Sequence, residues 1–537
     1  MKNKISILLT LFLIAGIFAG CASNTTATVQ ESADITASSV ASDTASEDSM
    51  FTDRDKEIGY SEADSTIVTL KDDASTVDGS GVTIAENIIT ISEEGTYIIS
   101  GSLSNGQILV NGPKDAKIQL VLNGVDISNE SSAAIYVKQA NKVFITTANG
   151  TNNTLSVTGE YVAVDENNID AVIFSKSDLT LNGAGILTAN GKYGHGIVSK
   201  DDLAVTSGTY NITSAEHGIS GKNSVRIADG TFNIESGTDA IHSENEDDTA
   251  LGFVYIEGGK ISINAGDDGI HAGNYVKICG GTVDISESYE GIEGLTIDIS
   301  GGDISVVSSD DGLNAAGGSD QSAQDAPQMG ANMSASDCLI NISGGTLTVN
   351  ASGDGIDSNG SITISGGIIT VSGPTENMNG TIDYNGAAEI TGGTLLGAGS
   401  SGMAEGFSDS STQCSILYNL SGTQQAGTKI TLTDESGNVI AGFAPEKQFQ
   451  AIYISVAALA QGKTYTLSVG SEEFTIELNA STYSNGGGGM GTGAMGGGHG
   501  DFGGGQPPQG TGGKMTNGQA PQADTGTNAT SSATVQQ

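Results

Sequence analysis

A repeat of about 22 residues constrains the fold of this chain more than any other feature. Between Gly258 and Ala315 one unit occurs three times: a Gly-Gly turn, a short aliphatic run, an acid, Gly, and then Ile or Leu. The step from Gly258 to Gly280 is 22 residues, and the step from Gly280 to Gly301 is 21. Such a period, with apolar residues alternating along short segments, is typical of a solenoid of stacked β coils and not of helices. The sequence therefore predicts an all-β fold, a parallel β-helix.

The repeat brings one polar residue of every coil to the same position, which we call the ladder position. In six coils this residue follows the first residue of the turn by 10 positions. The pairs are Ser207 and His217, Asp229 and Asp239, Gly258 and Asp268, Gly280 and Glu290, Gly301 and Asp311, and Gly344 and Asp354. An Ile or Leu stands two positions later: Ile197, Ile219, Ile241, Ile270, Ile292, Leu313 and Ile356. We expect the ladder residues to stack in register and the aliphatic residues to form an inward column.

Composition and repeat boundaries divide the chain into six segments. They are a lipoprotein signal peptide (1–21), a disordered tether (22–50), an N-terminal β cap (51–117), the parallel β-helix (118–400), a small C-terminal β module (401–480) and a disordered Gly-rich tail (481–537). The cap and the module are expected to cover the open ends of the solenoid, which would otherwise expose unpaired strand edges. The tether and the tail lack the apolar residues that a core requires.

The N-terminus predicts the cellular location. Lys2 and Lys4 precede an apolar stretch, 5–18, that has the layout of a signal peptide and is too short to span a bilayer comfortably. The end of this stretch, Phe18-Ala19-Gly20-Cys21, resembles a bacterial lipoprotein cleavage box, which implies a lipid on Cys21. The alternative is an ordinary secretory signal followed by a chance cysteine. We expect a monomer at the extracytoplasmic face of the cell membrane, attached through this lipid anchor only.

The charge balance limits the possible partners. The chain has 63 acidic and 20 basic residues and a formal net charge of −43. This excess of acid argues against nucleic acid, whose phosphates it would repel, and suits cation binding or solubility at a surface. Cys279, Cys338 and Cys414 are odd in number and unrelated in position, so we expect buried small side chains and not disulfides or a zinc site.

The ladder of acids predicts calcium. Carboxylates on adjacent coils would lie about 4.8 Å apart and repel by about 3.5 kcal/mol at an effective dielectric constant near 20. A cation midway between two of them would lie about 2.4 Å from each, a distance that suits Ca²⁺ and is too long for Mg²⁺. The alternative is a solvated acidic edge whose Asp-Gly pairs only form turns. The candidate ligands are Asp239, Asp267, Asp268, Glu290, Glu293, Asp310, Asp311, Asp354 and Asp357.

Four histidines lie close to the acids. His195 and His217 hold ladder positions, whereas His242 and His271 lie one residue beyond the aliphatic column. They could suggest a transition metal, but the chain has no short His motif, and packed or exposed histidines are the favoured interpretation.

Catalysis has one candidate residue. A polysaccharide lyase needs a base, commonly Arg or Lys, beside calcium and the uronate, and arginine occurs only at Arg54 and Arg226. Arg226 lies in a strand of the solenoid, where a structural ion pair is the favoured alternative. A ladder of acids also supplies many chance pairs of the kind that glycosidases use, so it specifies no hydrolase. We therefore assign no catalytic residue. In a sugar binder without Trp, Tyr and Phe would stack on the rings.

Several stretches together resemble a family of bacterial cell-surface β-helix proteins, the carbohydrate-binding domain-containing proteins. They are Phe51-Thr52-Asp53-Arg54-Asp55, Gly95-Thr96-Tyr97-Ile98-Ile99-Ser100-Gly101, Gln119-Leu120-Val121-Leu122-Asn123-Gly124, the Asp-Gly-Ile corners, and Gly462-Lys463-Thr464-Tyr465. The resemblance implies a right-handed, pectate-lyase-like β-helix that binds calcium and plant cell-wall polysaccharides such as cellulose and polygalacturonate, without catalysis. His195, His217 and Glu290 interrupt a uniform row of Asp ligands. A calcium-dependent lyase and a structural or adhesive surface protein remain the alternatives.

Overall fold

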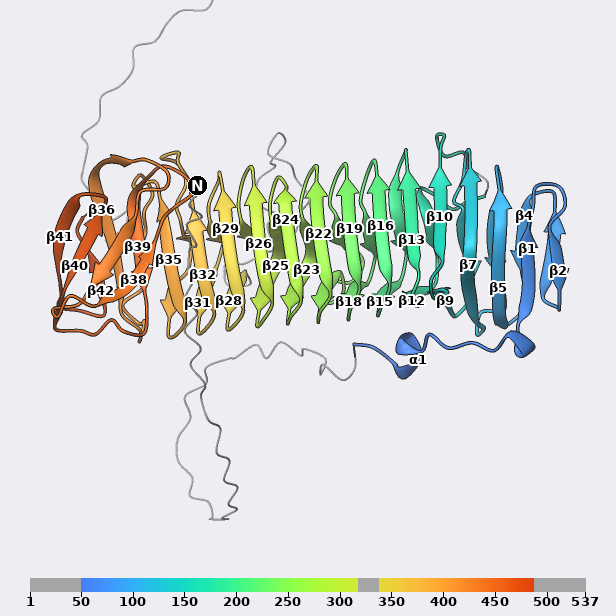
Figure 1. Ribbon diagram of the computed structural model, residues 1–537, viewed down its shortest axis with the longest axis horizontal. Helices are drawn as coiled ribbons and strands as arrows, with labels where there is room; N and C mark the ends of the chain where they lie inside the picture. Colours follow the sequence, from blue (N-terminus) through green and yellow to red (C-terminus); the bar gives the residue numbers. More distant parts are fainter. Residues whose placement is uncertain (1–49, 164, 317–337, 487–537) are drawn as a thin grey trace, which may run out of the picture.

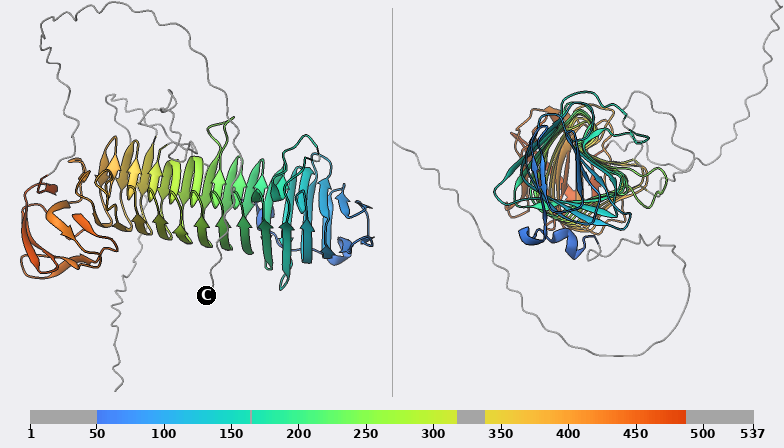
Figure 2. Two further views of the ribbon diagram at one scale, coloured as in Figure 1. Left: turned by 90° about the horizontal axis from the view of Figure 1, so that it is seen from above. Right: turned by 90° about the vertical axis from the view of Figure 1, so that its right-hand side faces the viewer.

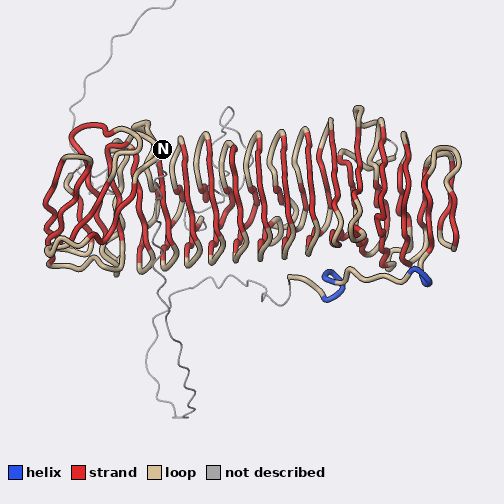
Figure 3. The backbone as a smooth tube through the Cα atoms, in the orientation of Figure 1, coloured by secondary structure: helices blue, strands red, loops and turns tan. Residues whose placement is uncertain are grey.

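The protein is a rod of stacked β coils, as the computed structural model in Figure 1 shows. The structure describes residues 50–163, 165–316 and 338–486. Each coil gives one strand to each of three sheets, and strands of successive coils pair in parallel. Figure 3 shows the strands following one another along the rod in this way. The predicted parallel β-helix is confirmed.

The first sheet runs along the whole rod. Its strands are β1 (Thr66–Leu70), β5 (Gly95–Leu103), β7 (Lys117–Asn129), β9 (Lys142–Thr147), β12 (Asp178–Gly183), β15 (Asp202–Val205), β18 (Ser224–Ile227), β21 (Phe253–Ile256), β23 (Ile270–Ile278), β25 (Ile292–Ile299), β28 (Leu339–Ile342), β31 (Ser361–Ile364) and β34 (Ala388–Ile390). The long strands β5, β7, β23 and β25 each pair in two sheets.

The second and third sheets follow in each coil. The second contains β10 (Asn152–Val157), β13 (Ile186–Gly191), β16 (Thr209–Ser214), β19 (Thr231–Ser236), β22 (Lys260–Ala265), β24 (Thr282–Glu287), β26 (Asp303–Ser308), β29 (Thr346–Ala351), β32 (Ile368–Ser372) and β35 (Thr394–Gly399). The third contains β4 (Ile88–Ile91), β6 (Gln107–Asn111), β8 (Ile135–Gln139), β11 (Ala171–Ser175), β14 (His195–Ser199), β17 (Ile219–Gly221), β20 (Ile241–Ser243), β27 (Leu313–Ala315), β30 (Ile356–Ser358), β33 (Asp383–Tyr384) and the first residues of β23 and β25.

The predicted aliphatic column forms part of the core. Ile219, Ile241, Ile270, Ile292 and Leu313 pair in register from coil to coil, and none of them is exposed. Full burial of one such side chain contributes about 1.5–3 kcal/mol. The end view in Figure 2 shows the coils superposed around this interior. The repeat in the sequence is therefore the repeat of the core.

The second glycine of each Gly-Gly turn is required by the stacking. Gly281 has φ +85°, in the left-handed region. A Cβ there would lie 2.8 Å from the main chain of the preceding coil, at Gly258 and Gly259. A side chain would thus cost both backbone strain and separation of the coils.

The N-terminal cap is smaller than the sequence predicts. Strands β1, β5 and β7 pair in parallel, as do β4, β6 and β8, so residues within 66–117 already form coils. Only β2 (Thr76–Asp78) and β3 (Val82–Ala85) add antiparallel strands. The cap boundary at 117 was wrong because the first coils have irregular lengths and lack the Gly-Gly turn that marks later ones.

Residues 50–57 form a strap along the first sheet, below the rod in Figure 1. It contains the short helix α1 (Asp53–Lys56), which Thr52 and Asp55 close with a capping box, and η2 (Glu62–Asp64) follows. The buried Asp55 carboxylate pairs with Lys142 Nζ at 2.7 Å and accepts from Thr180 Oγ1 at 2.6 Å. Burial alone would raise the pKa of Asp55, but hydrogen bonds from Lys142, Thr180 and Thr52 lower it to about 2.

The C-terminal module closes the other end of the rod. Strand β39 (Phe449–Ser455) pairs antiparallel with β35 of the last coil and with β36 (Ser415–Gln424), which also pairs with β42 (Thr482–Ser484). A separate antiparallel sheet contains β38 (Val439–Phe443), β37 (Ile430–Thr433), β40 (Lys463–Val469) and β41 (Glu472–Leu478).

Several predictions fall outside the described residues. These are the signal peptide with Cys21, nearly all of the tether, the insertion at 317–337 and most of the tail. Within the described ranges, no disulfide joins Cys279, Cys338 and Cys414. The described helices include none with the length and apolar character needed to cross a membrane.

Candidate functional site: the acidic corner

The ladder residues stack where the second sheet turns into the third. The amide nitrogen that follows each ladder residue donates to the carbonyl of the next ladder residue. For example, Gly269 N donates to Glu290 O, and Gly291 N donates to Asp311 O, both at 3.0 Å. Gly312 N continues the series to Asp354 O at 2.9 Å. The predicted ladder is therefore present, held in register by main-chain bonds.

The ladder side chains also bond along the stack. Asp239 Oδ1 accepts from Asp268 N at 3.1 Å, and Asp268 Oδ1 accepts from Glu290 N at 3.2 Å. Asp311 Oδ1 accepts from Asp354 N at 2.6 Å, and His195 Nδ1 accepts from His217 N at 3.1 Å. A cation midway between adjacent ladder carboxylates was expected, but an amide N–H takes one oxygen of each of these acids. Only the second oxygen is free for another partner.

A second polar column runs beside the ladder, and the sequence analysis did not recognise it as a column. It holds the residue three positions after each ladder residue, and we call it the flanking column. Its members pair in register across the third sheet: Ser220, His242, His271, Glu293, Asn314, Asp357 and Asp383. The signal was the recurring spacing of three, as in Asp268 and His271. Ligand groups can therefore come from two columns.

Three clusters gather most of the predicted ligands. Each cluster has one ligand atom per residue within 4.8 Å of the others. They are Asp239 with Asp267 and Asp268, Asp268 with His271 and Glu293, and Asp311 with Asp354 and Asp357. Glu290 and Asp310 are in none of the clusters found among the described residues. The Glu290 carboxylate instead accepts from Asn314 Nδ2 at 2.9 and 2.8 Å.

The cluster of Asp311, Asp354 and Asp357 concentrates uncompensated negative charge. Burial, followed by the charges of Asp354 and Asp357, raises the pKa of Asp311 to about 8. Burial and the neighbouring Asp354 raise the pKa of Asp357 to about 7. Burial raises the pKa of Asp354 to about 6 against a hydrogen bond that lowers it. These carboxylates need a proton or a cation in order to coexist.

The cluster of Asp268, His271 and Glu293 carries its own counter-charge. His271 Nδ1 lies 2.7 Å from Glu293 Oε2 and 3.2 Å from Asp268 Oδ2, and its side chain has no exposure. Burial lowers the pKa of His271, but the two carboxylates raise it well above its ordinary value. A histidine cation can thus occupy the place of a metal in this coil.

The donor set at Asp311, Asp354 and Asp357 fits calcium. All three offer carboxylate oxygens, the donors that hard cations such as Ca²⁺ take six to eight of. Asn314 pairs in register with Asp357, and its buried Oδ1 has no hydrogen-bond partner. A buried carbonyl oxygen without a donor is a cost that a cation would remove. The residues present therefore suit the ion that the sequence predicts.

Arg226 is engaged in the structure. Its Nη2 lies 3.4 Å from Asp202 Oδ2, and its Nη1 donates to Met50 O at 2.8 Å. Arg226 therefore ties the start of the strap to the first sheet, away from the ladder corner.

The outer face of the second sheet has two shallow grooves. One, of about 270 Å³, is lined by polar side chains that include Asn211, Asn233 and Ser262. The other, of about 290 Å³, continues along the rod past Asp284 and Ser305. These residues occupy equivalent positions on successive coils, so the face repeats a polar group once per coil.

The fold and the corner together define a parallel β-helix protein with a stacked acidic ladder. A sequence model for "Carbohydrate-binding domain-containing protein" matches residues 85–320. A curated relative of that description, from Acetivibrio thermocellus, is 41% identical over 135 residues, which cover 25% of this chain and 46% of the relative. The chain therefore belongs to the family of carbohydrate-binding domain-containing proteins. It spans about half the length of this curated relative.

One solved structure is also similar to this chain. It is described as a polysaccharide lyase-like protein from C. thermocellum, in a gadolinium derivative. It is 33% identical, and the match covers 45% of this chain and 93% of that chain with a TM-score of 0.39.

Proposed function

We propose that this protein binds polysaccharide at the cell surface without cleaving it, and that its acidic corner holds calcium. The single observation that carries the calcium proposal is the convergence of Asp311, Asp354 and Asp357 within 4.8 Å. Family membership supports carbohydrate as the ligand class. The structure adds a polar face that repeats with the coil, which suits a polymer of repeating units.

Calcium would act first as a structural ion. Asp311, Asp354 and Asp357 would provide carboxylate oxygens, and Asn314 would provide the amide oxygen that has no hydrogen-bond partner. The ion would neutralise carboxylates whose pKa values are raised by burial and by one another. An acidic polymer such as polygalacturonate would also need cations between its uronates and this acidic protein, whereas cellulose would need only hydroxyl contacts.

The polysaccharide would lie along the outer face of the second sheet. Asn211, Asn233 and Ser262 line the first groove, and amide and hydroxyl groups of this kind form the hydrogen bonds that fix sugar hydroxyls. Asn233 Nδ2 donates to Asn211 Oδ1 at 2.8 Å, so the row of amides is already ordered. A preordered row loses less entropy when a polymer binds.

The binding test uses affinity electrophoresis through polygalacturonate and pull-down with insoluble cellulose, each with calcium and with EDTA. We expect retardation or co-sedimentation that the paired substitution Asn233→Ala and Ser262→Ala weakens. Gln461→Ala, an exposed site on the C-terminal module, is the matched control. Absence of binding to either polymer would favour the alternative of a structural or adhesive surface protein.

A calcium-dependent lyase is the enzymatic alternative. Arg226 is its one candidate base, and the contacts of Arg226 with Asp202 and Met50 support a structural role. The test follows unsaturated product from polygalacturonate by ultraviolet absorbance. Turnover by the wild type that disappears in Arg226→Ala would replace the binder with the lyase.

The location at the membrane surface rests on the sequence near Cys21. Growth of the producing cells with a labelled fatty acid should label the wild type, and Cys21→Ser should release the protein from the membrane fraction. Retention of the label in Cys21→Ser would remove the lipoprotein proposal.

A further inference from the structure

The histidines next to the acidic corner form a continuous stack. The ring centroids of His195 and His217 are 4.9 Å apart, those of His217 and His242 are 4.1 Å apart, and those of His242 and His271 are 5.3 Å apart. The stack arises because His195 and His217 hold ladder positions while His242 and His271 hold flanking positions. Two columns of the fold therefore place imidazole rings against one another on successive coils.

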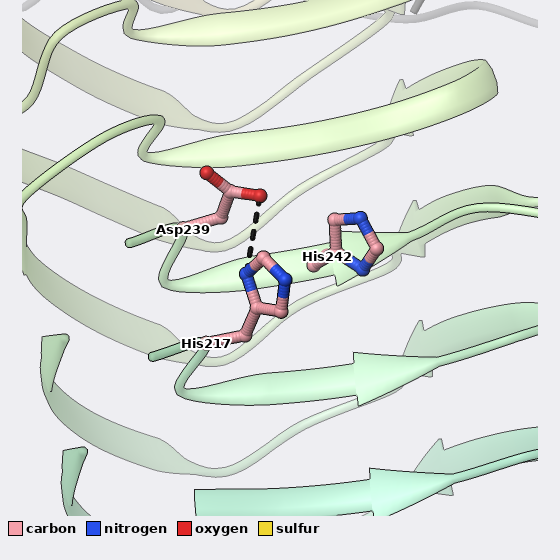
Figure 4. A group of neighbouring side chains, drawn as sticks. All are labelled: His217, Asp239 and His242. Carbon is pink, nitrogen blue, oxygen red and sulfur yellow. Dashed lines mark ion pairs between the residues drawn. The ribbon is translucent and has the colours of Figure 1, made fainter. Parts of the chain in front are cut away.

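Asp239 completes a group of three metal-ligating side chains within this stack. His217, Asp239 and His242 each offer one ligand atom, and these atoms lie within 4.8 Å of one another. Figure 4 shows the Asp239 carboxylate above the His217 ring, with His242 beside them on the next strand. His217 Nδ1 lies 3.2 Å from Asp239 Oδ2. Two ligands on one tetrahedral zinc ion, each about 2.0–2.1 Å from it, lie about 3.3 Å apart.

The Asp239 carboxylate supplies an independent sign of a missing ligand. Its Oδ1 accepts from the amide of Asp268, but its Oδ2 has no hydrogen-bond partner. The Asp239 residue has no exposure to solvent, so this oxygen is not satisfied by bulk water. A buried carboxylate oxygen without a hydrogen bond is costly, and here it points at the His217 ring.

The surroundings meet the other needs of a metal site. The His217 and His242 side chains are 16% and 12% exposed, which leaves a path from solvent. Thr238 Oγ1 lies 2.9 Å from His217 Nδ1, and Ser220 Oγ lies 3.2 Å from His242 Nδ1. Hydroxyls at this distance can orient an imidazole for coordination, as outer-shell groups do in other metal sites.

We propose that His217, Asp239 and His242 form a second metal site, which takes a divalent transition metal of the zinc class. Two imidazole nitrogens and one carboxylate are a donor set for zinc and its neighbours, whereas calcium takes oxygen donors. The site is separate from the proposed calcium cluster at Asp311, Asp354 and Asp357, which lies further along the same corner. Three protein ligands also leave an open position for water or another ligand.

The test is titration of the purified mature chain, stripped with EDTA, with Zn²⁺ by calorimetry and with Co²⁺ by visible absorption. We expect one Zn²⁺ per chain, a Co²⁺ spectrum with nitrogen ligation, and no displacement by excess Ca²⁺. His217→Gln, His242→Gln and Asp239→Asn should each weaken zinc by at least about 10–100-fold, the loss usual for supporting residues. Asp239→Asn keeps an acceptor for the amide of Asp268, so it leaves the ladder bond in place.

Two control variants separate this site from its neighbours. His195→Gln removes a ring of the same stack that is outside the group of three, and Asp354→Asn disables the calcium cluster. Both should bind zinc as the wild type does. No stoichiometric zinc in the wild type, or equal affinity in the double variant His217→Gln and His242→Gln, would overturn the proposal. Circular dichroism in EDTA establishes that each variant is folded.

Discussion

Oδ1 of Asp311 accepts a hydrogen bond of 2.6 Å from the main-chain nitrogen of Asp354, the equivalent residue on the next coil. The same bond joins Asp239 to Asp268 and Asp268 to Glu290. These ladder acids therefore have two roles. One oxygen satisfies an amide between coils, and the other remains charged at the corner, where a cation can compensate it.

The two roles can be separated at Asp311. Asp311→Asn keeps an oxygen for the Asp354 amide but removes the charge, so in EDTA it should be as stable as the wild type or more stable. Asp311→Ala loses the acceptor as well and should be less stable than Asp311→Asn by about 1 kcal/mol, the usual net contribution of a hydrogen bond. Urea denaturation in EDTA measures both. Equal stability of the two variants would mean that the amide bond contributes nothing.

The raised pKa values predict how stability depends on pH without calcium. The folded pKa values of about 8, 6 and 7 for Asp311, Asp354 and Asp357 lie above the ordinary value of 3.8. The folded state therefore binds protons more tightly than the unfolded state, and this contribution is lost as the pH rises from about 4 through 8. The melting temperature in EDTA should be higher at pH 5 than at pH 8. Calcium should raise it more at pH 8 than at pH 5, and an equal shift at both would contradict the site.

The strap predicts the opposite dependence at lower pH. The pKa of Asp55 is lowered to about 2 by its hydrogen bonds, against the effect of burial. Its contribution to stability is therefore present above about pH 4 and is lost as the pH falls towards 2. Asp55→Ala also leaves Lys142 without its buried partner, which costs about 3–5 kcal/mol in pairs of this kind. Limited proteolysis at neutral pH should cut near 50–57 faster in Asp55→Ala than in the exposed control Asp53→Ala.

Gly353 offers a steric test of the calcium cluster. A Cβ at this position would lie 2.3 Å from both Asp310 Oδ1 and Asp311 Oδ1, so alanine would displace the carboxylates. Gly353→Ala should weaken calcium binding measured by calorimetry. Gly422→Ala, whose Cβ would meet nothing within 4 Å, should bind calcium as the wild type does. Unchanged affinity in Gly353→Ala would place calcium elsewhere.

The sequence was sufficient for the coil and for the ladder. A constant offset of 10 residues and an aliphatic residue two positions later depend only on local spacing, and Asp268 with Ile270 stands in the structure where this spacing places it. The insertion of an amide N–H between adjacent acids was not predicted. That bond depends on how the next coil turns at the corner, which residue spacing does not specify.

Contacts between distant segments were also not predictable. Asp55 and Thr180 are 125 residues apart, and nothing in the local sequence of either indicates the other. The orphaned oxygens of Asn314 and Asp239 appear only when burial is known. Asn314 carries no acidic charge, so a search for acids could not find it. The histidine stack required the flanking column, whose members the sequence shows one at a time.

The most direct test of the central proposal is a crystal structure of the protein grown with calcium, with anomalous data to identify the ion. The account predicts a calcium ion bound by Asp311, Asp354 and Asp357, with Asn314 Oδ1 as a further oxygen ligand. Calcium absent from this corner at saturating concentration, with the three carboxylates in their present arrangement, would contradict it.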